Sequence, residues 1–170
     1  MDVFTAIYTR RSIRKYKPDT ISEEALKQIL MAGMQAPSSG NGQPWHFVVI
    51  DDVATLQRLG QIHPNAPMVA EAPMAILVCG EQQIDRYKPY LAQDLSAATQ
   101  NILLAAHAKG LGAVWVSIYP TLDRCDTVRR MLKIPAAVTP FSLIPLGYPD
   151  EEKPSENRFN PKRVRKNNWS

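Results

Sequence analysis

Cysteine and histidine are both scarce in this sequence. The 170 residues include two cysteines, Cys79 and Cys125, which lie far apart without a CxxC arrangement. We therefore expect neither a disulfide framework nor a zinc site built on cysteine. The three histidines show no spacing typical of metal ligands, so no metal is expected. Cys79 ends an apolar run, which predicts a small buried side chain.

Long hydrophobic runs are missing as well. The longest apolar segments are too short to cross a bilayer. The first residues, MDVFTAIYTRR, lack the basic start and long apolar stretch of a signal peptide. We therefore expect a cytoplasmic protein with no membrane partner. The composition, 45% hydrophobic and 21% charged, is typical of a globular protein, and the length fits one compact domain.

Charge of either sign is in small excess only. Lysine and arginine number 20 against 16 acidic residues, which gives a net charge of +4 and is too little to identify an anionic ligand. The basic residues concentrate at residues 10–15 and again at 162–166. Aromatic residues make up 8% of the chain, and none is interleaved with the second cluster. No nucleic-acid partner is expected, although a non-enzymatic module that binds nucleic acid or another anion stays an alternative.

The apolar spacing predicts alternating helices and strands. Ser22 is a plausible N-cap with two acidic residues after it, and Gly110 is well placed to end the longest helix. Pro145 lies inside the last predicted strand and indicates a strand end or an edge strand. Helices are expected at 3–8, from 23 to just before Pro37, at 53–59, 90–109 and 122–132, and strands at 46–50, 74–79, 112–118 and 141–146.

This mixture predicts an α+β fold of three layers around a small sheet. Residues 1–150 form the single domain in this interpretation. Residues 151–170 are polar and basic without apolar periodicity, so they form either a disordered tail or an arm that lies across another surface.

Two segments carry candidate chemistry. Arg10, Arg11, Ser12 and Arg14 form a short basic turn that suits a phosphate group, because arginine makes bidentate hydrogen bonds to its oxygens. A solvated helix end is the alternative interpretation. The segment at 37–45, PSSGNGQPW, has many small hydroxyl and amide side chains that could hydrogen-bond a planar heterocycle, or it is an ordinary turn.

The order RRSIRKY followed by APSSGNGQPWHFVVI resembles the FMN-dependent nitroreductase family. The segments QDLSAATQNILLAAHAKGLG, AVWVSIYP and IPLGYP agree in order, so the resemblance covers residues 3 to about 149. It implies a nitroreductase-like three-layer α-β-α fold with a mostly antiparallel central sheet. It also implies an interwoven homodimer with FMN at the subunit interface, and an arm, 151–170, that crosses onto the partner subunit.

The same resemblance implies a set of cofactor-binding residues. The phosphate and ribityl end and the pyrimidine edge of the flavin would be held by Arg10, Arg11, Ser12 and Arg14. The residues that would approach from the partner subunit are Pro37, Ser38, Ser39, Asn41 and Gln43. The segment that would lie over the isoalloxazine is Pro145, Leu146 and Gly147, with the Gly147 N–H near N5. Asn65 matches a polar flavin contact, and Arg158, with Arg165 as the weaker choice, matches a late phosphate-binding arginine.

The implied activity is ping-pong oxidoreduction, in which NADH or NADPH reduces FMN and a small acceptor such as a nitroaromatic, a quinone or a flavin then takes the electrons. No catalytic side chain is required, because the flavin carries the chemistry and the protein supplies binding and electrostatics. A different flavin reaction, such as that of a dehydrogenase or a dehalogenase, is the alternative within the same family.

Overall fold

The computed structural model describes residues 1–81 and 90–169. Most predicted elements are confirmed with small shifts at their ends. The helices are α1 (Val3–Thr9), α2 (Glu23–Met34), α3 (Val53–Leu59), α4 (Leu91–Ala108) and α5 (Leu122–Leu132). The strands are β1 (Trp45–Ile50), β2 (Met74–Glu81), β3 (Gly112–Ala113), β4 (Val116–Ser117) and β5 (Val138–Gly147), with short 3₁₀ turns η1 (Ser39–Asn41), η2 (Pro67–Val69) and η4 (Pro161–Arg163).

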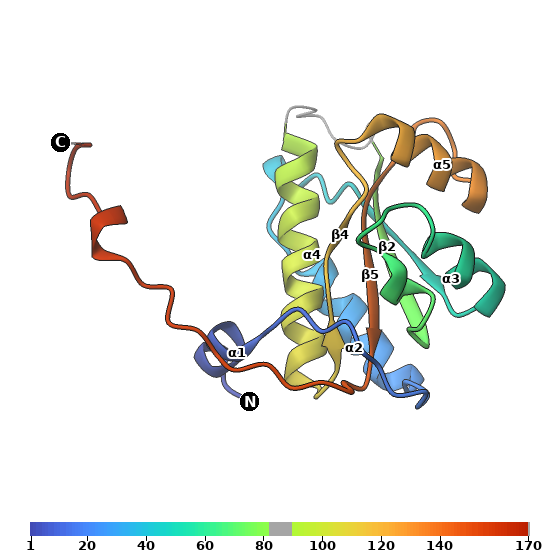
Figure 1. Cartoon of the computed structure of the whole chain (residues 1–170). Helices are drawn as coiled ribbons and strands as arrows, with labels where there is room; N and C mark the ends of the chain where they lie inside the picture. The colour runs from blue at the N-terminus through green and yellow to red at the C-terminus, as the bar shows by residue number, and fades with distance from the viewer. Residues whose placement is uncertain (82–89, 170) are drawn as a thin grey trace.

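The sheet separates two layers of helices, as predicted. Its order is β1-β2-β5-β3, β4 also pairs with β5, and the pairs between named strands are antiparallel. Successive residues of a strand point to opposite faces, so Ile76 packs in one core and Leu77 in the other. Figure 1 shows α2 and α4 on one face and α3 and α5 on the other. The central strands are therefore buried on both sides.

Local signals set the helix ends. The Ser22 hydroxyl accepts a hydrogen bond from the Ala25 N–H, which confirms the predicted cap of α2. Gly110 follows α4 with a φ of 78°, a left-handed conformation that suits glycine after a helix, and the Leu111 N–H then closes onto the Ala106 carbonyl. Both ends were predictable because each depends on residues a few positions apart.

Two strand predictions are wrong. The strand expected at 112–118 is interrupted, so that β3 and β4 are separate two-residue strands on either side of Val114 and Trp115. The strand expected at 141–146 is longer and central, so Pro145 lies near a strand end, as one alternative had it, but not on an edge strand. Pro145 lies opposite the interruption between β3 and β4, where no backbone N–H of β5 is needed for strand pairing on that side.

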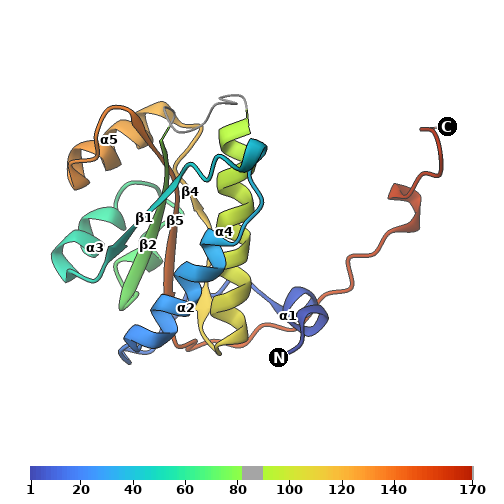
Figure 2. The ribbon, with the colours of Figure 1, turned by 180° about the vertical axis from the view of Figure 1, so that it is seen from behind.

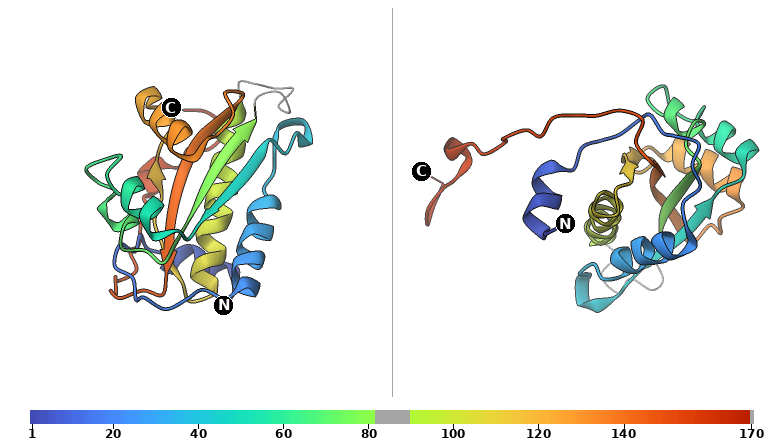
Figure 3. Two further views of the ribbon diagram at one scale, coloured as in Figure 1. Left: turned by 90° about the vertical axis from the view of Figure 1, so that its right-hand side faces the viewer. Right: turned by 90° about the horizontal axis from the view of Figure 1, so that it is seen from below.

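After β5 the chain runs back along the segment that follows α1. The Lys17 N–H donates to the Tyr148 carbonyl and the Asp150 N–H to the Lys15 carbonyl, both at 2.9 Å. The Lys153 ammonium reaches the Ser12 carbonyl at 2.7 Å. Beyond residue 158 the chain leaves the body as an extended arm, seen from behind in Figure 2 and from below in Figure 3. Within the two described stretches, none of the helices has the length and apolar character needed to cross a membrane.

Candidate functional site: an arginine cavity and a separate shaped loop

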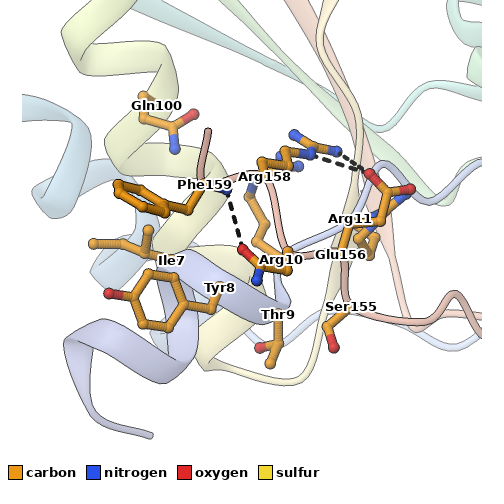
Figure 4. Close-up of a pocket in the computed structure, with 11 residues that line it drawn as sticks. Ile7, Tyr8, Thr9, Arg10, Arg11, Gln100, Ser155, Glu156, Arg158 and Phe159 are labelled. Carbon is orange, nitrogen blue, oxygen red and sulfur yellow. Dashed lines mark hydrogen bonds and ion pairs between the residues drawn. The ribbon is translucent and has the colours of Figure 1, made fainter. Parts of the chain in front are cut away.

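A cavity of about 830 Å³ brings together three of the predicted phosphate ligands (Figure 4). Arg10 and Arg11 enter it from the end of α1, and Arg158 enters from the base of the arm, almost 150 positions later in the chain. Ile7, Tyr8 and Phe159 form an apolar side. The cavity therefore offers concentrated positive charge beside apolar surface.

One acid lies among these arginines. Glu156 accepts from Arg11 Nη2 at 2.6 Å through one carboxylate oxygen, and from Nε and Nη2 of Arg158, both at 3.1 Å, through the other. These bonds lower the pKa of Glu156 to about 2, so it is ionised at any ordinary pH. Sequence analysis missed this residue, because nothing in the local pattern signals a partner 145 positions away.

Arg10 differs from its two neighbours. Within the described residues it has no carboxylate partner, whereas Arg11 and Arg158 share one. Burial, followed by the positive charges of Arg158 and Arg11, lowers the pKa of Arg10. An arginine stays protonated through such a shift, so the cavity holds a half-buried cation that an incoming anion would stabilise.

The next predicted residues lie on a strip fixed against β3. Ser12 forms a bridge with Ala113, whose carbonyl accepts the Ile13 N–H at 3.1 Å. A side chain at Gly112 would come within 2.5 Å of Ile13, so the glycine lets this strip approach closely. The Arg14 N–H donates to the Glu151 carboxylate at 2.5 Å, and its own side chain is exposed. The strip is thus held in place while Arg14 stays accessible.

The end of β5 lies beside that strip. Gly112 pairs with Gly147 and Ala113 with Leu146, so Pro145, Leu146 and Gly147 are neighbours of the Ser12 strip through β3. All three are buried. Tyr16 closes the arrangement, because its hydroxyl reaches the Ile13 carbonyl at 2.7 Å and the Pro145 carbonyl at 3.2 Å. Burial raises the pKa of Tyr16, which keeps the phenol neutral.

The loop at 37–43 has a defined shape. Gly40, Asn41 and Gln43 have φ values of 56°, 56° and 49°, in the left-handed region that residues other than glycine seldom adopt. The Ser39 N–H donates to both carboxylate oxygens of the buried Asp94, at 3.0 and 3.1 Å. Left-handed residues other than glycine are concentrated at binding sites, which favours the functional interpretation over an ordinary turn. Sequence analysis did not identify Asp94 as the anchor.

The loop and the arginine cavity are far apart in one chain. The Glu81 N–H bonds to the Pro44 carbonyl, and Glu81 pairs with Val138, which places the loop at the first residue of β5. Gly147 is nine residues further along, so the two ends are roughly 30 Å apart. Arg10, Arg11, Ser12, Arg14, Gly147 and Arg158 therefore group at one end of the sheet, and Pro37, Ser38, Ser39, Asn41 and Gln43 at the other.

Asn65 and Arg165 belong to neither group. Asn65 lies in the exposed turn before η2, where its N–H donates to His63 Nδ1 at 2.9 Å. Arg165 lies in the arm, over the ring of Trp169 at 5.7 Å from its centroid. Of the two candidates for the late arginine, only Arg158 lines the cavity.

The residues of the cavity fit a phosphate monoester such as that of FMN. Guanidinium groups form paired, charge-assisted hydrogen bonds with phosphate oxygens, and Arg10 is a half-buried cation without a carboxylate partner in the described parts of the chain. The cavity is also wide enough to admit such a group.

Known proteins resemble this chain in sequence and in fold. The sequence profile of the nitroreductase family matches residues 7–63 and 61–148. A Methanothermobacter thermautotrophicus protein, provisionally named NADH dehydrogenase/NAD(P)H nitroreductase, is 46% identical over 169 residues, spanning 99% of this chain and 88% of the relative. An FMN-dependent nitroreductase from Clostridium difficile is 32% identical, with a TM-score of 0.92 over 98% of this chain and 100% of the other. A Desulfovibrio desulfuricans structure in complex with FMN, provisionally named a nitroreductase, is 33% identical, with a TM-score of 0.88 over 100% and 99%.

Proposed function

Because this chain belongs to the nitroreductase family, we propose that it is an FMN-dependent oxidoreductase that takes electrons from NADH or NADPH and delivers them to a small acceptor. Nitroaromatics, quinones and free flavins are the acceptor classes. The nicotinamide donor and the acceptor use the same site in turn, which gives ping-pong kinetics. The observation that carries the proposal is the cavity lined by Arg10, Arg11 and Arg158. Arg11 and Arg158 share Glu156 there, and Arg10 has no carboxylate partner among the described residues.

The residues of the chain bind and orient in this mechanism. Bound FMN supplies reversible two-electron chemistry at its isoalloxazine ring. Arg10 and Arg158 hold the phosphate, with Ser12 on the adjacent strip toward the ribityl chain. Arg14, exposed on that strip, would hold the pyrimidine edge, where a cation favours the reduced flavin. The main chain of Gly147 would bind the reactive edge of the ring, and no side-chain acid or base would be needed.

The second half of the site comes from another copy of the chain. A loop roughly 30 Å from Gly147 cannot contact the same flavin within one chain. The loop at 37–43 therefore serves the site of the partner subunit. Exposed apolar side chains support such a dimer: Phe4 and Tyr8 of α1 are 63% and 65% exposed, and Trp169 of the arm is 87% exposed.

An anaerobic absorbance titration tests the activity. The purified protein, reconstituted with FMN where it has lost it, should show an oxidised flavin spectrum that bleaches on addition of NADH or NADPH. The donor that bleaches it at lower concentration is the preferred one. A protein that retains no FMN after reconstitution would overturn the proposal.

Hybrid dimers test the two-chain site. Chains carrying Arg10→Ala and chains carrying Asn41→Ala with Gln43→Ala are co-expressed with different affinity tags. If each site takes the arginines from one chain and the loop from the other, the hybrid has one intact site and binds about half the wild-type amount of FMN. Sites built within one chain leave the hybrid without an intact site, and no recovery is then seen.

A further inference from the structure

Arg158 reaches the cavity from an exposed segment. Its side chain is 68% exposed, although it lines the cavity. Its ion pair and its side-chain hydrogen bonds in the described residues all go to Glu156. The position of this guanidinium group therefore depends on a residue two places away along the same arm.

Glu156 is in turn fixed from the body of the protein. Its other carboxylate oxygen accepts from Arg11 Nη2 at 2.6 Å, and the Arg11 side chain is only 18% exposed. The carboxylate thus connects a mostly buried arginine on the body to a mostly exposed arginine on the arm, and Figure 4 shows it between the two. This is the arrangement of a relay rather than of an isolated surface ion pair.

We propose that Glu156 is a positioning residue for the cofactor phosphate, which holds Arg158 in the cavity by tying it to Arg11. This inference rests on the proposed function. It assigns different roles to the three arginines: Arg10 and Arg158 contact the phosphate, and Arg11 anchors Glu156.

Two opposing effects decide whether loss of Glu156 weakens or strengthens FMN binding. Removing the Glu156 charge removes a repulsion toward the phosphate, but that repulsion is screened because the carboxylate is half exposed. Removing its bonds frees the Arg158 side chain, and the rotamer freedom of an arginine must then be lost again when the phosphate binds. The proposal requires the second effect to be the larger, so it predicts that loss of Glu156 weakens FMN binding.

The test compares FMN with riboflavin, which has the same ring system without the phosphate. Dissociation constants for the FMN-stripped full-length protein are measured by flavin fluorescence for wild type, Glu156→Gln, Arg158→Ala and the double variant. Glu152→Gln is the matched control, because it removes the same charge from an exposed position on the same segment. Glu156→Gln should weaken FMN binding about three- to tenfold and leave its riboflavin dissociation constant within twofold of wild type. Glu152→Gln should bind both flavins within twofold of wild type.

The double variant separates positioning from a general structural effect. If Glu156 acts through Arg158, Glu156→Gln costs nothing further once Arg158 is alanine. An equal loss in that background would overturn the proposal, as would tighter or unchanged FMN binding by Glu156→Gln, which would make the carboxylate a competitor or a bystander. A wild-type protein that binds neither flavin would instead overturn the proposed function.

Discussion

At the scale of single residues, the decisive feature is a half-buried cation that has no carboxylate partner among residues 1–81 and 90–169. Arg10 is surrounded by Arg11 and Arg158, and its pKa is lowered by burial and by both of them. Glu156 offsets part of the repulsion in this cluster, but Arg10 is still repelled by its neighbours, because like charges near a protein surface interact at an effective dielectric well below that of water. A phosphate group bound beside Arg10 would relieve this repulsion.

We expect Arg10→Ala to weaken FMN binding more than riboflavin binding. Charge-assisted hydrogen bonds contribute about 1.5–3 kcal/mol each, which corresponds to a loss of roughly 10- to 100-fold in FMN affinity. Arg10→Lys keeps the charge and should therefore lose less affinity than Arg10→Ala. It should still bind FMN more weakly than wild type, because a lysine cannot make the paired contact. Arg163→Ala, in η4 of the arm and outside the cavity lining, is the control. Equal losses for FMN and riboflavin would show that Arg10 does not contact the phosphate.

His107 should make the fold sensitive to acid. Its Nε2 lies 2.8 Å from the Thr9 hydroxyl, and burial, followed by the positive charge of Arg10, lowers its pKa. The unfolded chain therefore binds this proton more readily than the folded chain, so stability falls as pH drops below the ordinary histidine pKa of about 6.5. His107→Gln should reduce the loss of Tm between pH 7.5 and pH 5.5. A pH profile equal to that of wild type, with His63→Gln for comparison, would contradict this assignment.

At the scale of elements, the sequence could predict what depends on neighbours in the chain. The Ser22 cap, the glycine after α4 and the apolar faces of the helices all follow from residues a few positions apart. Strand extent does not. Pro145 indicated a strand end or an edge strand. It lies two residues before the end of β5, but β5 is central, and proline is tolerated there because it faces the interruption between β3 and β4.

The candidate site divides in the same way. Both early motifs could be identified from the sequence, since each is a continuous segment. Their supports could not: Glu156 meets Arg11 across 145 positions, and Asp94 meets Ser39 across 55. Neither acid has a local signal, since acids at a helix start or in a polar tail are common and usually solvated. Contacts of this kind follow from topology, which composition and periodicity do not determine.

Asp94 should control the order of the loop at 37–43. Asp94→Ala removes the acceptor of the partly buried Ser39 N–H, and losing such a hydrogen bond should lower the free energy of unfolding by about 1 kcal/mol. Asp94→Asn keeps one carbonyl acceptor and should cost less. Urea denaturation measures the stability, and hydrogen exchange should speed up at residues 39–43 in the alanine variant. Unchanged exchange at these amides would show that the left-handed residues hold the loop without Asp94.

At the scale of the whole molecule, large aromatic side chains of the arm are exposed in a single copy of the chain. Phe159 is 74% exposed and Trp169 is 87% exposed, and the hydrogen bonds of Lys162 and Arg165 go to residues within the arm itself. The shaped loop and the arginine cavity lie at opposite ends of the sheet. The dimer proposed above, in which a second copy completes the cavity and covers the arm, would account for both features.

Removing residues 159–170 should therefore weaken the dimer while leaving the body of the chain folded. The cores on the two sides of the sheet lie in residues 21–146, and the deletion touches neither. Burial of Phe159 and Trp169 on a partner is worth several kcal/mol, so the dimer dissociation constant should rise by about 100-fold or more. Light scattering over a dilution series measures this, with circular dichroism to check the fold.

The single variants Phe159→Ala and Trp169→Ala should each produce part of the effect. A truncated chain that stays dimeric at nanomolar concentration would place the interface on α1 and the body rather than on the arm. Because Arg158 is retained in that truncation, loss of FMN together with loss of the dimer would then report on the partner's loop and not on the phosphate ligands.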